Sequence, residues 1–374
     1  MTLKVDEVLS MVGGTGENSY AINNKIEERK FERPKSIVKQ NVLELYSLLH
    51  PKNFVTADLG CSSGINAFML FSEIMDGINE SCDKLSLSPP EIHLFLNDLH
   101  GNDFNTVFRS LNAHKEKLMK EKGEKFLPFY PVGVPGSFFT RLFLKNTVHF
   151  MYSTLSVHWL SEVPRGLVSE DGVALNPGNI YISKTSPPIV PKLYFEQYKR
   201  DFTMFLKHRS DEMCSGGRMV LTYVGRSVPD HSESVGNTYI WSLISRALNE
   251  MVAKGAIKAK DVDTFNMPLY KPSMEEVKLV TEMEGSFDIV ETEIMEPFWD
   301  LSTKIEDRVK NDNIKTGTVI AKEMRAVAES LLAAHFGEAI MDDLFSRLAE
   351  IIADHISKEK GKHVLFTVAF QKRG

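Results

Sequence analysis

Apolar residues recur with two different periods along the first two thirds of the chain. Short apolar runs at residues 54–60, 89–99 and 218–226 have the length and the turn-rich flanks of buried β-strands. Apolar residues at helical spacing fill residues 67–78, after the first run, and residues 193–213, before the third. This alternation of strand and helix predicts a parallel sheet that is covered by helices on both faces.

Four further strands are predicted from shorter patterns. Residues 148–160 form a β-like apolar run, and residues 179–185 form another after a segment rich in Gly and Pro. Late in the chain, residues 286–295 and 363–371 have the composition of strands that return to the sheet. We therefore expect segments from the last third of the chain to complete the sheet.

The alternation of strand and helix ends after Gly225, and long helical patterns follow at residues 238–255 and 337–356. The predicted fold is α/β, a doubly wound (Rossmann-like) sheet with a helical cap over one edge. A ligand would bind in the cleft between the sheet and this cap. The predicted division is an N-terminal segment and ligand-binding core at 1–235, a mainly helical cap at 236–356 with one strand at about 286–296, and a final core strand at 357–374.

Composition and charge narrow the class of protein. The chain has 374 residues, of which 43% are hydrophobic and 25% charged, as in ordinary globular proteins. The formal net charge is −6 and the basic residues are scattered, so we expect no nucleic-acid partner. The first residues lack the apolar core of a signal peptide, and no apolar run reaches about 18 residues. These features predict a cytoplasmic protein without a membrane span.

The stretch TADLGCSSGIN, residues 56–66, reads as the end of a strand, a glycine turn and the start of a helix. A dinucleotide site has the pattern G-x-G-x-x-G, whereas this turn has only Gly60 and Gly64 and is preceded by Asp58. A carboxylate there repels a phosphate and favours a cation. S-adenosylmethionine carries a sulfonium and an ammonium group and no phosphate, so it is the preferred ligand. Asp98 ends the second strand, where a doubly wound fold places the acid that binds the ribose hydroxyls.

Longer stretches resemble the plant SABATH methyltransferases along nearly the whole chain. In order, these are MVGGTGENSYAINN, ADLGCSSGIN, LNDLHGNDFN, GVPGSFFTRLF, HWLSEVP, GGRMVLTYVGR, DTFNMPLYKPS, GSFDI, MRAVAE and HFGEAI. That family methylates small carboxylic acids such as salicylate, benzoate and jasmonate, or ring nitrogens of xanthine alkaloids, with S-adenosylmethionine as donor. The resemblance implies S-adenosylmethionine binding by the core at 1–235, a helical cap over the active site, a small-molecule acceptor and a homodimer.

Position by position, the resemblance implies two sets of binding residues. The donor set is Tyr20, Asn24, Asp58, Cys61, Asn66, Asp98, Leu99, Ser137 and Phe138. The acceptor set is Glu27, Leu155, His158, Trp159, Val224, Ile240, Trp241, Tyr270, Met324, Val327 and His363. Two of these are the catalytic candidates: the indole N–H of Trp159 would donate to the acceptor oxygen, and His158 would hydrogen-bond to the acceptor.

Some members of the family hold Mg²⁺ near an asparagine and a D-x-F-N segment. The matching residues are Asn176, Asp263, Phe265 and Asn266. Since one carboxylate with amide and carbonyl oxygens makes a poor Mg²⁺ cage, we expect at most a weakly bound ion without a catalytic role.

Two positions depart from the carboxyl methyltransferases of the family. Glu27 stands where they usually have glutamine, and Leu155 where many have tyrosine, whereas Trp241, Met324 and Val327 resemble the salicylate and benzoate branch. We favour methyl-ester formation on a small acid, either benzoate-like or salicylate-like, or an amine-containing alkaloid precursor that would suit Glu27. The alternatives are N-methylation of a xanthine, as in caffeine synthase relatives, and a non-catalytic ligand-binding protein.

Overall fold

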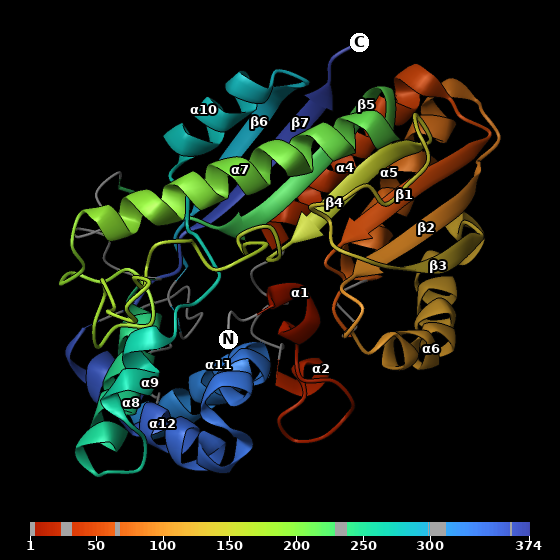
Figure 1. Ribbon diagram of the computed structural model, residues 1–374. Helices are drawn as coiled ribbons and strands as arrows, with labels where there is room; N and C mark the ends of the chain where they lie inside the picture. The colour runs from red at the N-terminus through yellow and green to blue at the C-terminus, as the bar shows by residue number, and fades with distance from the viewer. Residues whose placement is uncertain are drawn as a thin grey trace.

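In the computed structural model of the chain, a mixed β-sheet forms the centre of the molecule (Figure 1). The described residues are 4–23, 32–63, 68–228, 238–297, 299, 312–359 and 361–374. Among them, the sheet has seven strands in the order β3-β2-β1-β4-β5-β7-β6. Their bounds are β1 Asn53–Leu59, β2 Glu91–Asp98, β3 Phe129–Pro135, β4 Val148–Thr154, β5 Met213–Val224, β6 Phe287–Met295 and β7 Leu365–Lys372.

Strand direction divides the sheet into two parts. Strands β1 to β5 run parallel, and β7 lies antiparallel between β5 and β6. Strand β1 lies in the interior of the sheet, with β2 on one side and β4 on the other, so Asp58 pairs in register with Leu96 and Tyr152. The predicted doubly wound core is confirmed, and the late segments complete it as an antiparallel pair.

Helices cover both faces of the sheet (Figure 1). Helices α4 (Glu32–Leu49) and α5 (Met69–Leu85) pack together on one face, and α7 (Ile189–Glu212) crosses the other. Neighbouring residues of β4 show the two sides, because Phe150 belongs to the hydrophobic core under α4 and α5, and Met151 to the core under α7. Strand β4 is thus buried on both faces, as its nearly continuous apolar run predicts.

Four helices gather beyond the carboxyl ends of the parallel strands (Figure 1). They are α8 (Thr238–Ala253), α9 (Ala259–Thr264), α11 (Asn313–Phe336) and α12 (Met341–Lys358), the last preceded by a 3₁₀ turn at Glu338–Ile340. Helices α11 and α12 approach closely at Gly317, where an added Cβ would come within 2.5 Å of the Ala349 carbonyl oxygen. Within the described ranges, no helix has the length and apolar character needed to cross a membrane.

The remaining helices lie at the margins of the sheet and near the cap. Helix α10 (Met274–Glu284) packs against α7 and β6, so this part of the segment 236–356 covers the sheet. The short helices α1 (Val5–Val8) and α2 (Tyr20–Asn23) contact α11 of the cap. Helix α6 (Phe104–Lys122), followed by a 3₁₀ turn at Gly123–Lys125, lies beside β3 at the sheet edge (Figure 1).

Two strand predictions are wrong in part or in whole. The run at 148–160 is a strand only as far as Thr154, because Leu155 has a φ of 57° and turns the chain away from the sheet. Residues 179–185 form no strand, although Ile180 is fully buried. The Ile180 N–H donates to the hydroxyl of Ser245 in α8, and its carbonyl accepts from Met267, so its backbone joins the cap and not the sheet.

Candidate active site

A cavity of about 960 Å³ opens at the carboxyl ends of the parallel strands, and we call it the sheet-edge cavity. Strands β1, β2 and β4 end in its wall with Asp58, Asp98 and Thr154. This is the edge at which doubly wound folds bind their ligands. The predicted donor residues that line it are Tyr20, Asp58, Cys61, Asp98, Leu99, Ser137 and Phe138.

The turn after β1 is fixed by its backbone. Gly60 has a φ of 82°, and an added Cβ would lie 2.3 Å from the hydroxyl oxygen of Ser156. The N–H groups of Gly60 and Cys61 both donate to the Asn97 carbonyl oxygen at 2.9 Å, and the Ser156 hydroxyl donates to the Gly60 carbonyl oxygen at 3.0 Å. Since only glycine tolerates this conformation and this close approach, Gly60 sets the path of the turn.

Two carboxylates face the sheet-edge cavity, the buried Asp58 and the half-buried Asp98. Asp98 accepts hydrogen bonds from the backbone N–H groups of Ser62 (2.7 Å) and Leu99 (2.8 Å). Burial raises the Asp98 pKa to about 6, although these two hydrogen bonds oppose the rise. Burial, and then the charge of Asp98, hold the Asp58 pKa well above its ordinary value. A cation or a set of hydroxyl donors would relieve this desolvation, so the pair fits the sulfonium, ammonium and ribose groups of S-adenosylmethionine.

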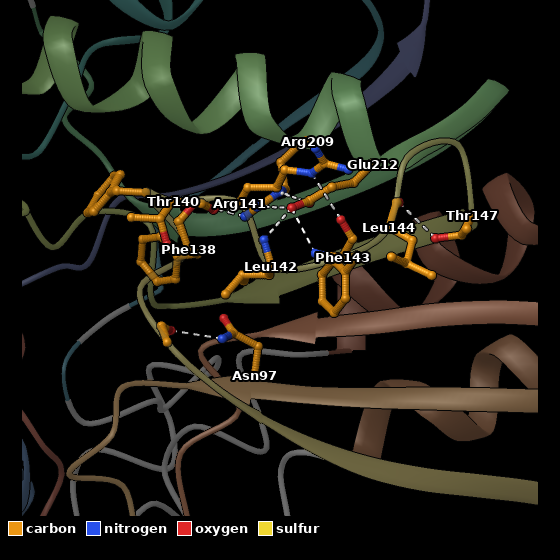
Figure 2. A network of polar contacts seen from close by, with 12 residues as sticks. Asn97, Phe138, Thr140, Arg141, Leu142, Phe143, Leu144, Thr147, Arg209 and Glu212 are labelled. Carbon is orange, nitrogen blue, oxygen red and sulfur yellow. Dashed lines mark hydrogen bonds and ion pairs between the residues drawn. The ribbon is translucent and has the colours of Figure 1, made fainter.

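The loop after β3, which carries Phe138 into this wall, is held from behind by a buried ion pair. Arg209 and Glu212 near the end of α7 form an ion pair at 2.7 Å, and both side chains have 0% exposure. Figure 2 shows this pair beside the loop. The Arg209 guanidinium also donates to the carbonyl oxygens of Phe138 (2.8 Å) and Thr140 (2.9 Å). Glu212 accepts from the N–H of Phe143 at 3.0 Å. The ion pair therefore fixes the loop by hydrogen bonds to the loop's own backbone carbonyl and N–H groups.

A second cavity of about 850 Å³ lies between the sheet and the cap helices, and we call it the cap cavity. Most of its wall is apolar, with Val224 at the end of β5, Trp241 on α8 and Met324 on α11. The predicted acceptor residues that line it are Leu155, His158, Trp159, Val224, Ile240, Trp241, Met324, Val327 and His363.

The two cavities adjoin. Met11, Tyr20, Leu155 and Trp159 line both of them. The backbone of Trp159 is held at this border by an antiparallel bridge to Leu269. Its backbone N–H also donates a 3.0 Å hydrogen bond to the Ser156 carbonyl oxygen. A group bound in one cavity can therefore reach a group bound in the other beside the Trp159 ring.

Comparison with known proteins identifies the family. A family model described as SAM-dependent carboxyl methyltransferase matches residues 6–373. The chain belongs to this family. It is accordingly an S-adenosylmethionine-dependent methyltransferase, as the SABATH resemblance predicts.

Individual relatives of this methyltransferase match it over almost their full length. It is 44% identical to the benzoic acid/salicylic acid carboxyl methyltransferase 3 of Petunia hybrida, with 99% of each chain covered. It is 39% identical to a 3,7-dimethylxanthine N-methyltransferase of Camellia sinensis var. assamica, over 99% of this chain and 97% of the relative. A solved structure of loganic acid methyltransferase with SAH superposes with a TM-score of 0.83 at 32% identity, over 97% of this chain and 99% of that one.

One predicted acceptor residue of the methyltransferase lies outside both cavities. Tyr270 is fully buried, and its hydroxyl donates to Glu276 at 2.9 Å and accepts from Arg226 at 3.1 Å. Its backbone N–H donates to the His158 carbonyl oxygen at 2.8 Å. Tyr270 therefore supports the wall from behind, and the following residue, Lys271, lines the cavity in its place.

The charge state of His158 follows from its surroundings. Burial, and then the nearby charge of Lys271, lower the His158 pKa to about 3. The ring is therefore neutral at pH 7, and its Nδ1 has no hydrogen-bond partner among the described residues. A neutral imidazole of such low pKa can hydrogen-bond to a ligand but is a weak proton acceptor.

Sequence reasoning missed several residues that line the cap cavity, namely Met11, Asn23, Lys271 and Glu323. Lys271 and Glu323 look like solvent-facing charges in their local sequence, and only the tertiary contacts bring them to a cavity. Three predicted residues, Asn24, Glu27 and Asn66, lie outside the described residues.

The predicted Mg²⁺ residues do not form a cage for the ion. The Asp263 carboxylate accepts from the Gly178 N–H at 2.7 Å, and the Asn176 side-chain oxygen accepts from the Ser186 hydroxyl at 2.7 Å. Asn266 offers one buried amide oxygen that has no hydrogen-bond partner within the described part of the chain. No group of three His, Cys, Asp or Glu side chains suited to a metal occurs where the chain is described. Since Mg²⁺ requires near-octahedral oxygen coordination, we assign Mg²⁺ no role in the reaction.

Proposed function

We propose that this methyltransferase forms the methyl ester of a small carboxylic acid, of the benzoate or salicylate type or an amine-containing alkaloid precursor. The sheet-edge cavity would bind the donor and the cap cavity the acceptor. The observation that carries the proposal is the position of Trp159 in the wall of both cavities. An indole can donate a hydrogen bond and cannot act as a base, which suits a nucleophile that is already anionic.

The donor would be held by the polar groups of the sheet-edge cavity. Asp98 would accept from the ribose hydroxyls, and Asp58 would favour the positive charge of the donor. Ser137 and Phe138 would lie beside the adenine. When bound, S-adenosylmethionine supplies an electrophilic methyl group on its sulfonium.

The reaction of the acceptor does not require a general base in the cap cavity. A small carboxylic acid has an ordinary carboxyl pKa, so it is ionised at pH 7 and needs no general base. Trp159 would orient the attacking oxygen, and neutral His158 would accept or donate a hydrogen bond. The apolar wall would exclude water. Fixing the two reactants in line contributes up to roughly 7–11 kcal/mol of rate acceleration in well-oriented systems.

Xanthine N-methylation is the second candidate, and the similarity to the Camellia sinensis enzyme favours it. A ring N–H must lose its proton during or after the transfer, so that reaction gains from a base near neutral pKa. The His158 pKa of about 3 does not supply one. A carboxylic acid is therefore the preferred acceptor.

A transfer assay distinguishes these reactions. The protein is incubated with methyl-labelled S-adenosylmethionine and a panel of benzoates, jasmonates, amino acids and xanthines. We expect label in a methyl ester that is cleaved by alkali, and a strong loss of label with the Asp98→Ala variant as a control for donor binding. Label only in N-methylxanthines would replace the proposal with the second candidate. Donor binding without transfer to any acceptor would favour a ligand-binding protein.

We further propose that the enzyme works in the cytosol as a homodimer with a small-molecule acceptor. The resemblance to the SABATH family supports the dimer. Light scattering coupled to size-exclusion chromatography tests the first statement, because a dimer has twice the 42.3 kDa mass of the chain. Fractionation of the source tissue tests the second.

A further inference from the structure

The turn after β4 lies between the two cavities, and its backbone conformation is unusual. Leu155 has a φ of 57°, in the left-handed region that residues other than glycine rarely adopt. Its N–H donates to the carbonyl oxygen of Thr222 in β5 at 2.7 Å, which holds the chain in this conformation. Leu155 and, four residues later, Trp159 line both cavities. Strained backbone that the surrounding structure holds in place is typical of functional sites, so this turn is a candidate for one.

Ser156 connects this turn to the turn after β1. Its hydroxyl donates to the Gly60 carbonyl oxygen at 3.0 Å and lies farther, at 3.3 Å, from the Thr154 carbonyl oxygen. The carbonyl oxygen of Ser156 accepts from the Trp159 N–H at 3.0 Å. Where the chain is described, no other hydrogen bond joins residues 60–63 to residues 155–161. One serine therefore connects the turn after β1 to the tryptophan at the border of the cavities.

The contact between Ser156 and Gly60 is close as well as polar. A Cβ added at Gly60 would lie 2.3 Å from the hydroxyl oxygen of Ser156 and 2.4 Å from its Cβ. On the other side of the turn after β1, the N–H groups of Gly60 and Cys61 donate to the Asn97 carbonyl oxygen of β2. The turn is thus held between β2 and Ser156. A displacement of Ser156 would therefore change the separation between this turn and Trp159.

The far end of the turn after β4 is fixed by separate elements. The Leu160 N–H donates to the Pro268 carbonyl oxygen at 2.8 Å, in the segment that precedes α10. The Ser161 N–H donates to the carboxylate of Asp201 in α7 at 2.9 Å. Trp159 is thus held against α7 and the segment before α10. The serine hydroxyl then determines how closely this part of the protein approaches the turn after β1.

We propose that Ser156 is a positioning residue that fixes the separation between the bound methyl donor and Trp159, and through Trp159 the direction from which the acceptor attacks. Methyl transfer requires the two reactants in line, and a misplacement of about 1 Å can lower a rate roughly a hundredfold. The serine hydroxyl takes part in no bond-making or bond-breaking step. This inference rests on the proposed assignment of the donor to the sheet-edge cavity and of the acceptor to the cap cavity.

The test variant is Ser156→Ala, and Ser153→Ala is its matched control. The Ser153 hydroxyl donates at 2.6 Å to the carbonyl oxygen of Leu59, the residue before Gly60, but Ser153 is buried in β4 and is not among the described lining residues of either cavity. The single-turnover rate constant is measured with protein in excess over methyl-labelled S-adenosylmethionine and with saturating benzoate, or the best acceptor of the panel if benzoate is not methylated. We expect Ser156→Ala to lower this rate constant about tenfold or more, and the Kd of S-adenosylhomocysteine to change by less than about threefold. Ser153→Ala should keep the rate constant within about twofold of the parent protein, because the turn after β4 retains its link to Gly60.

Three results overturn the inference: a Ser156→Ala rate constant close to that of the parent protein, an equal fall in Ser153→Ala, or a loss of S-adenosylhomocysteine affinity as large as the loss of rate. Urea denaturation shows that each variant is folded under the assay conditions. If Ser156→Ala does not fold, Ser156→Cys replaces it, because a thiol is a weak donor of similar size, and its rate constant should fall while the Kd is kept. An unchanged Kd of S-adenosylhomocysteine in Asp98→Ala would place the donor outside the sheet-edge cavity. That result refutes the proposed function and is separate from the outcome for Ser156.

Discussion

The two cavities that meet at Trp159 are built in different ways. In the sheet-edge cavity the backbone fixes the polar groups: Asp98 accepts from two backbone N–H groups, and Gly60 has a backbone conformation that other residues rarely adopt. In the cap cavity, apolar side chains from separate elements form the wall, among them Val224 of β5 and Met324 of α11. If donor and acceptor bind as proposed, donor binding depends on a backbone framework, and acceptor choice depends on side chains from separate elements.

The acceptors named for two relatives are consistent with this difference between the cavities. A chain named for benzoic and salicylic acid and a chain named for 3,7-dimethylxanthine both match over 97% or more of their length. A shared framework with an exchangeable acceptor wall accounts for such a pair. If the two cavities are independent, single substitutions should perturb one of them and leave the other unchanged.

Arg209→Ala should damage the framework of the sheet-edge cavity most. It leaves the Glu212 carboxylate buried without its cation and frees the carbonyl oxygens of Phe138 and Thr140. Removing one partner of a buried ion pair costs about 3–5 kcal/mol of the free energy of unfolding. Urea denaturation measures this loss.

Arg165→Ala is the matched control. Arg165 forms a pair with Glu162 at the same sequence spacing, but its side chain is 83% exposed. Exposed pairs contribute about 0–1 kcal/mol, so the free energy of unfolding should hardly change. Equal losses in the free energy of unfolding for Arg209→Ala and Arg165→Ala would mean that the buried pair does not hold the loop after β3.

Asp98→Ala should weaken ligand binding in the sheet-edge cavity and leave the cap cavity unchanged. It removes a charged acceptor from the ribose hydroxyls, which costs roughly 1.5–3 kcal/mol, or more than about tenfold in the Kd of S-adenosylhomocysteine. Titration calorimetry gives that constant. An unchanged Kd would remove Asp98 from the donor site.

Trp159→Phe should separate binding from turnover at the border of the cavities. Phenylalanine keeps most of the packing and deletes the indole N–H, so kcat should fall by roughly tenfold or more through the loss of one hydrogen bond to a charged group. The Kd of S-adenosylhomocysteine should change by less than the fall in kcat. Parallel losses in both quantities would mean that Trp159 is a structural residue.

The pKa of Asp98 predicts how donor affinity depends on pH. Burial raises that pKa to about 6, and the ionised form accepts more strongly from ribose hydroxyls than the protonated form. Affinity for S-adenosylhomocysteine should therefore rise severalfold between pH 5 and pH 7.5 and then level off. The comparison protein is Asp98→Asn, whose profile should be nearly flat over this range. A steep profile in that variant would assign the titration to another group.

Removal of divalent metal should have the smallest effect. The segment around Asp263 lacks a set of carboxylates for Mg²⁺, so chelation with EDTA should change kcat by less than about twofold. Steady-state assays with and without added Mg²⁺ measure this. A large, Mg²⁺-reversible loss of turnover would return the ion to the mechanism.

The framework was easier to predict from the sequence than the acceptor wall, for physical reasons. The turn after β1 is local: Asp58, Gly60 and the flanking strand lie within a few residues, and backbone conformation dictates their types. Strand β3 escaped prediction because Pro131 and Pro135 interrupt its pattern, which an edge strand tolerates.

The acceptor wall depends on contacts between distant segments. Lys271 reaches the cap cavity because the bridge between Trp159 and Leu269 brings its segment beside the turn after β4. Tyr270, one position earlier, turns to Glu276 instead. No periodicity in the local sequence distinguishes these two neighbours, so the prediction came only from the resemblance, which named Tyr270, whereas Lys271 lines the cavity.

A crystal structure of the protein with S-adenosylhomocysteine and benzoate would show whether donor and acceptor occupy the two cavities as proposed. We expect the ribose hydroxyls to contact Asp98 in the sheet-edge cavity. We expect benzoate to lie in the cap cavity with a carboxylate oxygen about 2.7–3.2 Å from the indole nitrogen of Trp159, the range of an N–H···O hydrogen bond. An acid bound outside the cap cavity, or with its carboxylate turned away from Trp159 and from the donor sulfur, would contradict this assignment.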